Sequence, residues 1–172
     1  MIEFMIISAP RSASTWASNW LTTDTTLCLH DPLLRWPKEQ WNSLQSVKRL
    51  GIACTGVALF PAWINEHPAR KVILHRDLSD VDQSLANIGM TPIGKYWGGV
   101  LEKIHGVHLP WSDLFERPKF IYEYLLDLPF DEERHAYLRE INIQPNFGNL
   151  SINRAATASR PCRRPTMAAR ES

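Results

Sequence analysis

Short apolar runs alternate with helical patterns along this chain, and this alternation constrains the fold more than any other feature of the sequence. Strands are predicted at Glu3–Ser8, Thr26–His30, Gly51–Leu59, Lys71–His75 and Lys119–Tyr122. Helices are predicted at Ser14–Thr23, Pro37–Arg49, Phe60–His67, Pro92–His105 and Asp131–Glu140. A further helix, capped by Asp77 or Ser79, is predicted to run to about Ile88. Strands separated by helices pair in parallel, with helices on both faces of the sheet. The sequence therefore predicts an α/β protein with three layers, α/β/α, around a mostly parallel sheet of about five strands.

Composition places this domain among ordinary globular proteins. A chain of 172 residues can bury one core, and 44% apolar and 22% charged residues are typical values. The net charge of +1 gives no reason to expect a nucleic-acid partner. No apolar run approaches the ~20 residues of a membrane-spanning helix, and the acidic Glu3 with no basic leader argues against a signal peptide. We expect no membrane association.

The cysteines indicate a reducing compartment. Cys28, Cys54 and Cys162 are odd in number and far apart, so they form neither a disulfide framework nor a zinc motif. We therefore expect a cytoplasmic protein with buried, free thiols. Nothing in the sequence fixes the oligomeric state.

The composition changes at about Ser151. Beyond it Ala, Ser, Thr, Pro and Arg dominate, and few apolar side chains remain to bury. We expect a domain over 1–150 and a basic, flexible C-terminal tail over 151–172.

The loop after the first strand is rich in small and hydroxyl residues. Arg11 can clamp anionic oxygens, and the hydroxyls of Ser12, Ser14 and Thr15 can donate to them. A strand, a tight loop and a helix N-terminus together form a site that favours the binding of an anion. The loop is not a Walker A motif, because Ala13 or Ser14 stands at its second glycine and no lysine follows.

A second anion-binding pattern follows the fourth predicted strand. Arg76 stands at the strand end, and Ser84 lies eight residues further on, in the next predicted helix. An arginine fork and a hydroxyl suit a phosphate. Because the carboxyl ends of parallel strands share one edge of the sheet, two such patterns predict a ligand with two phosphate-type groups.

Both stretches resemble motifs of the sulfotransferases that use 3'-phosphoadenosine 5'-phosphosulfate (PAPS). Their first motif is approximately Pro-[Lys/Arg]-Ser-Gly-Thr-Thr-Trp, and Pro10–Trp16 reads Pro-Arg-Ser-Ala-Ser-Thr-Trp. Their second is approximately Arg-Asp-Pro-x-Asp-x-x-x-Ser, and Arg76–Ser84 reads Arg-Asp-Leu-Ser-Asp-Val-Asp-Gln-Ser. A weaker echo of their Tyr-Glu-Asp-Leu segment is Tyr122–Leu126. The resemblance spans about Ile2–Ile143 and implies a P-loop nucleotide-hydrolase-like fold.

The resemblance also implies a role for each matching residue. Arg11 would neutralise the phosphosulfate and the leaving phosphate. The 5' phosphate would lie on the loop, and the adenine would lie against Trp16. The 3' phosphate would be bound by Arg76 and Ser84. The residues of the loop itself are Ser12, Ala13, Ser14 and Thr15. The implied reaction transfers a sulfuryl group from PAPS to a hydroxyl or amine of a small molecule or carbohydrate, without a metal.

The general base is expected after the second strand. Asp31, followed by Pro32, is the closer analogue of the family's acidic residue, and His30 is the second candidate. The alternative is that Asp31 only turns the chain before proline.

Two departures from the family pattern keep other functions open. Ala13 replaces the motif glycine, and the late Gly-rich basic loop of many members is absent. A non-catalytic nucleotide-binding protein of the same fold is therefore an alternative. A P-loop kinase is less favoured, because the lysine of Walker A is missing.

Overall fold

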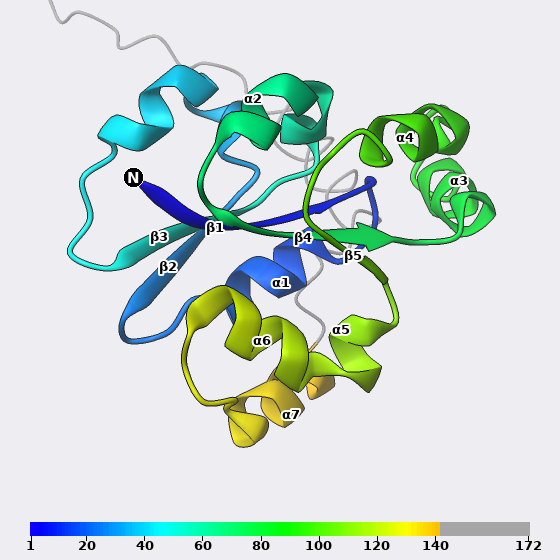
Figure 1. Cartoon of the computed structure of the whole chain (residues 1–172). Helices are drawn as coiled ribbons and strands as arrows, with labels where there is room; N and C mark the ends of the chain where they lie inside the picture. Colours follow the sequence, from blue (N-terminus) through cyan, green and yellow to red (C-terminus); the bar gives the residue numbers. More distant parts are fainter. Residues whose placement is uncertain (142–172) are drawn as a thin grey trace, which may run out of the picture.

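The computed structural model of this chain describes residues 1–141, and these form one parallel sheet with helices on both faces (Figure 1). Its strands are β1 (Ile2–Ser8), β2 (Thr26–His30), β3 (Arg49–Ala53), β4 (Arg70–His75) and β5 (Val107–Pro110). They lie in the order β2-β3-β1-β4-β5, and every neighbouring pair is parallel. The three-layer α/β/α prediction is confirmed. The predicted tail over 151–172 lies outside the described residues.

Two layers of helices enclose the sheet. One layer holds the 3-10 helices η2 (Lys38–Ser43) and η3 (Gly56–Leu59) with α2 (Pro61–Glu66), α3 (Leu78–Ala86) and α4 (Gly94–Leu101). The opposite layer holds α1 (Ser14–Trp20), α5 (Asp113–Glu116), α6 (Pro118–Leu126) and α7 (Glu132–Glu140). A further 3-10 helix, η1 (Pro32–Leu34), follows β2. No described helix is long and apolar enough to cross a membrane.

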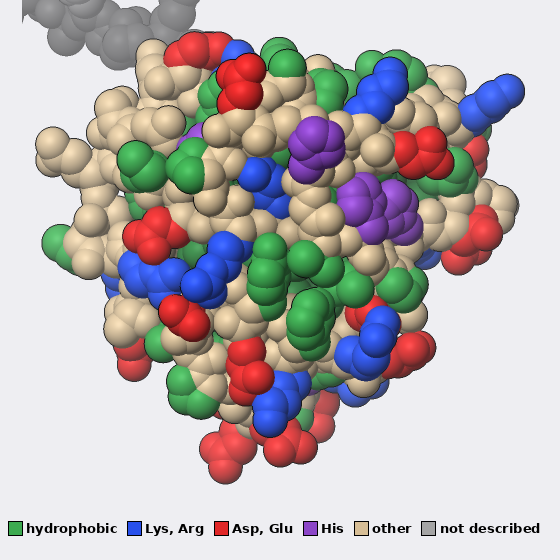
Figure 2. Space-filling view, in the orientation of Figure 1, with side chains coloured by type: hydrophobic (Ala, Val, Ile, Leu, Met, Phe, Trp, Pro, Cys, Tyr) green, Lys and Arg blue, Asp and Glu red, His purple; other side chains and the backbone are tan. Residues whose placement is uncertain are grey.

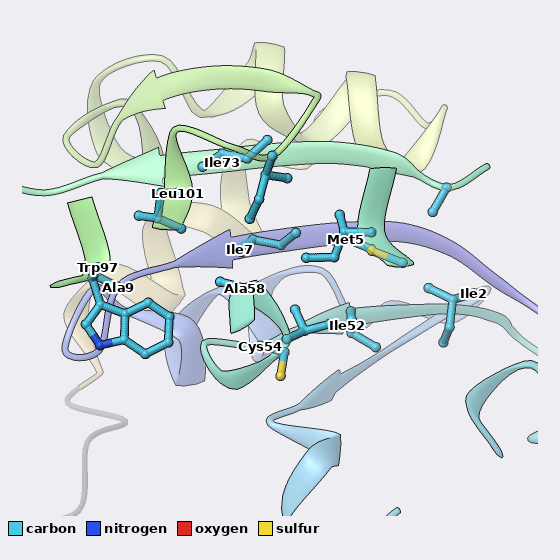
Figure 3. Packing of buried hydrophobic residues seen from close by; sticks show 14 of the residues in the cluster. Ile2, Met5, Ile7, Ala9, Ile52, Cys54, Ala58, Ile73, Trp97 and Leu101 are labelled. Carbon is cyan, nitrogen blue, oxygen red and sulfur yellow. The ribbon is translucent and has the colours of Figure 1, made fainter. Parts of the chain in front are cut away.

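Strand alternation divides the core between these layers. Successive side chains of β1 point to opposite faces, so Met5 and Ile7 join one cluster while Phe4 and Ile6 join the other. Figure 3 shows the first cluster, in which Ile7 lies beside Ile73 and Trp97 of α4 lies near Ala9. With both faces covered, β1 becomes the near-continuous apolar run that the sequence displays.

One predicted strand is wrong, and a true strand was missed. Lys119–Tyr122 lies within α6, whose Ile121 and Leu125 recur at helical spacing and are fully buried. The last strand is instead β5, which contains the exposed His108 and ends at Pro110. Such a short edge strand with polar and proline residues gives a weak sequence signal.

Two further boundaries differ from the prediction. The helix predicted over Pro37–Arg49 is reduced to η2, because only Trp41 of its apolar face is buried and Val47 is fully exposed. The strand predicted over Gly51–Leu59 ends at Ala53, and its second half forms η3. A short apolar run cannot distinguish a buried strand from a buried turn of helix.

Candidate anion-binding site

The chain reverses its winding direction between β1 and β4. After β1 it continues toward β2 on one side of the sheet, and after β4 it continues toward β5 on the other. Ligands of open α/β sheets bind at such a switch point, outside the carboxyl ends of the strands. The two predicted anion-binding stretches begin at this place, because one follows Ser8 of β1 and the other follows His75 of β4.

Side chains from the two stretches meet at this switch point. The Nε atom of Arg11 donates a hydrogen bond of 3.1 Å to the hydroxyl of Ser84, which lies in α3. The guanidinium of Arg76 donates to the backbone carbonyl of Arg11. Residues 73 positions apart thus share one site. The structure therefore brings together Arg11, Arg76 and Ser84.

The guanidinium of Arg76 lies in a site that suits an anion. Its Cζ atom lies 4.8 Å from the ring centroid of Trp111, in cation–π contact. Its Nε atom is buried and has no hydrogen-bond partner among residues 1–141. A buried donor without an acceptor costs about 1–3 kcal/mol, and an anionic oxygen would remove this cost. The donors present fit a phosphate.

The loop between β1 and α1 has a strained backbone. Arg11 and Ala13 adopt φ values of 61° and 63°, in the left-handed region that favours glycine. Ala13 occupies the glycine position of the motif. It adopts the left-handed backbone conformation expected for glycine, although it carries a Cβ atom. Ser12 is buried, and its hydroxyl lies 3.4 Å from the carbonyl of Pro10. Such strain is tolerated at functional sites.

His30 and Asp31 lie beside the start of α1. The Nε2 atom of His30 is 3.1 Å from the hydroxyls of Ser14 and Thr15. It is also 3.1 Å from the Oδ2 atom of Asp31. All these oxygens surround a single ring nitrogen. The group is therefore not a Ser-His-Asp relay, which uses both nitrogens of the imidazole.

Asp31 also connects β2 to the loop after β3. Its Oδ1 atom accepts a hydrogen bond of 2.9 Å from the backbone N–H of Thr55. Its backbone has a φ of 40°, which is rare for a residue with a side chain. The carboxylate is held in a fixed orientation with Oδ2 toward His30, as a positioned base requires. Thr55 was not among the predicted site residues.

Trp16 lies in the core and is 7% exposed. Its indole N–H donates a 2.9 Å hydrogen bond to the carbonyl of Leu138, and its ring packs against Trp20 and His135. Burial lowers the pKa of His135. Trp16 and Trp20 recur at helical spacing on the face of α1 that meets α7. The predicted contact of Trp16 with adenine remains a prediction.

Sequence reasoning missed Trp111 because β5 was missed. The segment after the last core strand is Trp111-Ser112-Asp113-Leu114, and this segment takes the place assigned to Tyr122–Leu126. Tyr122 itself is buried in α6. The signal available in the sequence was the alternation of Val107 and Leu109 after Gly106.

The described residues include candidates for neither a reactive thiol nor a metal site. Burial raises the pKa of the Cys54 thiol to about 12 and that of Cys28 further, so both thiols are protonated at neutral pH. Within residues 1–141, no group of three or more His, Cys, Asp or Glu side chains could hold a metal ion.

Fold and site together define an α/β protein with two arginines at the switch point of a parallel sheet. Its structure is similar to that of the mouse sulfotransferase SULT7A1 complexed with PAP, with a TM-score of 0.46 and 14% sequence identity. The similarity covers 80% of this chain and 62% of the mouse chain, so the chain spans less than two thirds of that protein. No family model matches the sequence. No curated protein matches it either.

Proposed function

We propose that this protein is a PAPS-dependent sulfotransferase that acts on a hydroxyl or amine of a small-molecule or carbohydrate acceptor. The observation that carries the proposal is the meeting of Arg11 with Ser84 and of Arg76 with the Arg11 backbone at the switch point. A ligand with two separate phosphate-type groups matches this donor set. The two motifs that resemble the sulfotransferase family are the two stretches that meet.

Each phosphate group has its own set of donors under this proposal. The loop hydroxyls of Ser12, Ser14 and Thr15 bind the 5' phosphate. Arg76 and Ser84 bind the 3' phosphate. Arg11, which contacts Ser84 and precedes the loop hydroxyls, carries positive charge between the two groups. No metal ion is needed, since the arginines can balance the charge.

The transfer requires an in-line nucleophile and a stabilised leaving group. PAPS supplies the sulfuryl group on a phosphate oxygen. A bond forms between sulfur and the acceptor oxygen or nitrogen, and the bond from sulfur to that phosphate oxygen breaks. The acceptor proton passes to Asp31, and the negative charge left on the phosphate is met by Arg11. His30, at 3.1 Å from Asp31, orients the carboxylate or takes its place as base.

A binding titration tests the proposal and its rivals. We expect purified full-length protein to bind 3'-phosphoadenosine 5'-phosphate (PAP) in calorimetry without added magnesium, and more tightly than ATP. A kinase would instead bind ATP in a magnesium-dependent manner. Equal affinity for PAP and ATP, or no binding of PAP, would reject the proposal. A non-catalytic binding protein would bind PAP but transfer no sulfate to any acceptor in a broad panel.

Arg76→Ala is expected to weaken PAP binding by about 10- to 100-fold, because it removes charged hydrogen bonds to the 3' phosphate. The same variant should bind adenosine 5'-phosphate, which lacks that group, nearly as well as the parent protein. Calorimetry with both nucleotides measures the difference. A variant that loses affinity equally for both ligands would show that Arg76 does not read the 3' phosphate.

Asp31→Asn is expected to lower turnover by about 100- to 10,000-fold while PAP affinity stays nearly unchanged. Asparagine keeps a carbonyl oxygen for the Thr55 N–H, so the loop anchor is retained. Transfer of labelled sulfate to hydroxyl and amine acceptors gives the rate, and calorimetry gives the affinity. Unchanged turnover would mean that Asp31 only turns the chain before Pro32.

A further inference from the structure

Two histidines are in contact across β4 and β5: His75 is the last residue of β4, and His108 is the second residue of β5. The Nε2 atom of His75 is 2.7 Å from the Nδ1 atom of His108, and the rings stack with their centroids 5.0 Å apart. The Nε2 atom of His108 lies 2.8 Å from the carbonyl oxygen of Ile104, which can accept a hydrogen bond but cannot donate one. His108 therefore carries its proton on Nε2, and its Nδ1 accepts from His75. Figure 2 shows histidine side chains gathered on this face of the molecule.

This pair is linked to Arg76 of the candidate site through Trp111. The backbone carbonyl of His75 accepts a 2.8 Å hydrogen bond from the N–H of Trp111, which joins the ends of the two strands. The Trp111 ring in turn lies under the guanidinium of Arg76, the residue that follows His75. Through Arg76 the contacts continue to the carbonyl of Arg11. The histidine pair is thus two contacts away from the groups that face the anion.

We infer that His75, His108 and Trp111 are positioning residues for Arg76, and that double protonation of the histidine pair releases Arg76 and weakens anion binding. The inference rests on the proposed role of Arg76 in binding the 3' phosphate. A neutral or singly protonated pair keeps the bond from His75 to His108. A second proton on Nδ1 of His108 sets two N–H groups against each other at 2.7 Å and breaks the contact. The ends of β4 and β5 then separate, and Trp111 moves with them.

The surroundings of His75 favour its uncharged state. Burial and the neighbouring His108 lower the pKa of His75, and Glu102 at the end of α4 opposes this shift. Arg76 adds a further positive charge beside His75 in the chain. Direct Coulomb attraction between protonated histidines and the anion predicts the opposite pH effect, because added positive charge near Arg76 would tighten anion binding. The two accounts therefore differ in the sign of the pH effect.

The test has one arm without ligand and one with it. In nitrogen-15 NMR of the full chain, the Trp111 indole signal, assigned with Trp111→Phe, should titrate together with the imidazole signals of the pair. In His108→Asn, which keeps an acceptor near Nδ1 but does not titrate, the Trp111 signal should stay constant. In calorimetry, the ratio of PAP affinities at about pH 8 and about pH 5.5 should be about tenfold larger in the parent protein than in His108→Asn. His75→Gln is a second non-titrating variant, and the exposed His105→Asn is the matched control.

The outcomes separate the inference from the proposed function. Protonation of the pair that leaves the Trp111 signal unmoved would overturn the inference. The same pH profile of PAP affinity in the parent protein and His108→Asn would also overturn it. Failure of PAP to bind at either pH would contradict the proposed function alone, because the tryptophan signal reports the coupling without nucleotide. Circular dichroism at both pH values confirms that each variant is folded.

Discussion

Arg11→Ala is expected to lower sulfate-transfer turnover by about 100- to 1,000-fold or more, the typical loss when a fixed donor to developing charge is removed. In the structure its side chain reaches Ser84 from the loop after β1. Under the proposed function Arg11 lies between the two phosphates and balances the charge that develops on the leaving phosphate. The backbone carbonyl that Arg76 uses is unaffected by the substitution. The rate is measured with labelled PAPS at saturating nucleotide.

Arg139→Ala is the matched control for this variant. Arg139 lies in the last turn of α7, and its Cζ atom lies 5.8 Å from the ring centroid of Phe115. Its removal changes the net charge by the same amount, and turnover should stay within about twofold. If Arg11→Ala and Arg139→Ala reduced turnover equally, Arg11 would act only through the net charge of the protein and not through a specific contact.

Gly51→Ala is expected to lower the free energy of unfolding by about 3 kcal/mol or more, because it overpacks the centre of the sheet. Gly51 of β3 lies opposite Phe4 of β1. A Cβ atom at residue 51 would lie 2.0 Å from Cε2 and 2.2 Å from Cζ of the Phe4 ring, which is fully buried. Urea unfolding followed by circular dichroism measures the change.

Two companion variants give this prediction its control. Gly99→Ala in α4 meets no atom within 4 Å and should raise stability by about 0.5–1 kcal/mol through helix propensity. Phe4→Leu shortens the clashing ring, so the double variant Gly51→Ala/Phe4→Leu should be more stable than the sum of the single changes. Additive losses would show that the Phe4 ring is not the cause.

The fold was predictable wherever local signals agreed with tertiary packing. β2 was predicted with its observed bounds, Thr26–His30. Asp131 was predicted as a helix cap, and its side chain accepts from the N–H of Arg134. Prediction failed where packing overrode the local signal. The apolar run at Lys119–Tyr122 is one face of α6, and the edge strand β5 lacks the apolar character of the central strands.

The parts of the candidate site were predictable, but their connections were not. Loop composition indicated Arg11, and strand-end position indicated Arg76 and Ser84. That Arg11 would contact Ser84, 73 positions further along the chain, has no local signal in the sequence. The stacking of Arg76 on Trp111 depends on a strand pairing between residues more than 30 positions apart, which has no local signal.

Phosphorus-31 NMR of PAP bound to the protein tests the central claim most directly, because the 5' and 3' phosphates give separate signals. The two-phosphate site predicts that both signals shift on binding, and that Arg76→Ala returns only the 3' signal toward its free position. A shift of the 5' signal alone in the parent protein would contradict the claim that Ser84 and Arg76 form a site for the second phosphate.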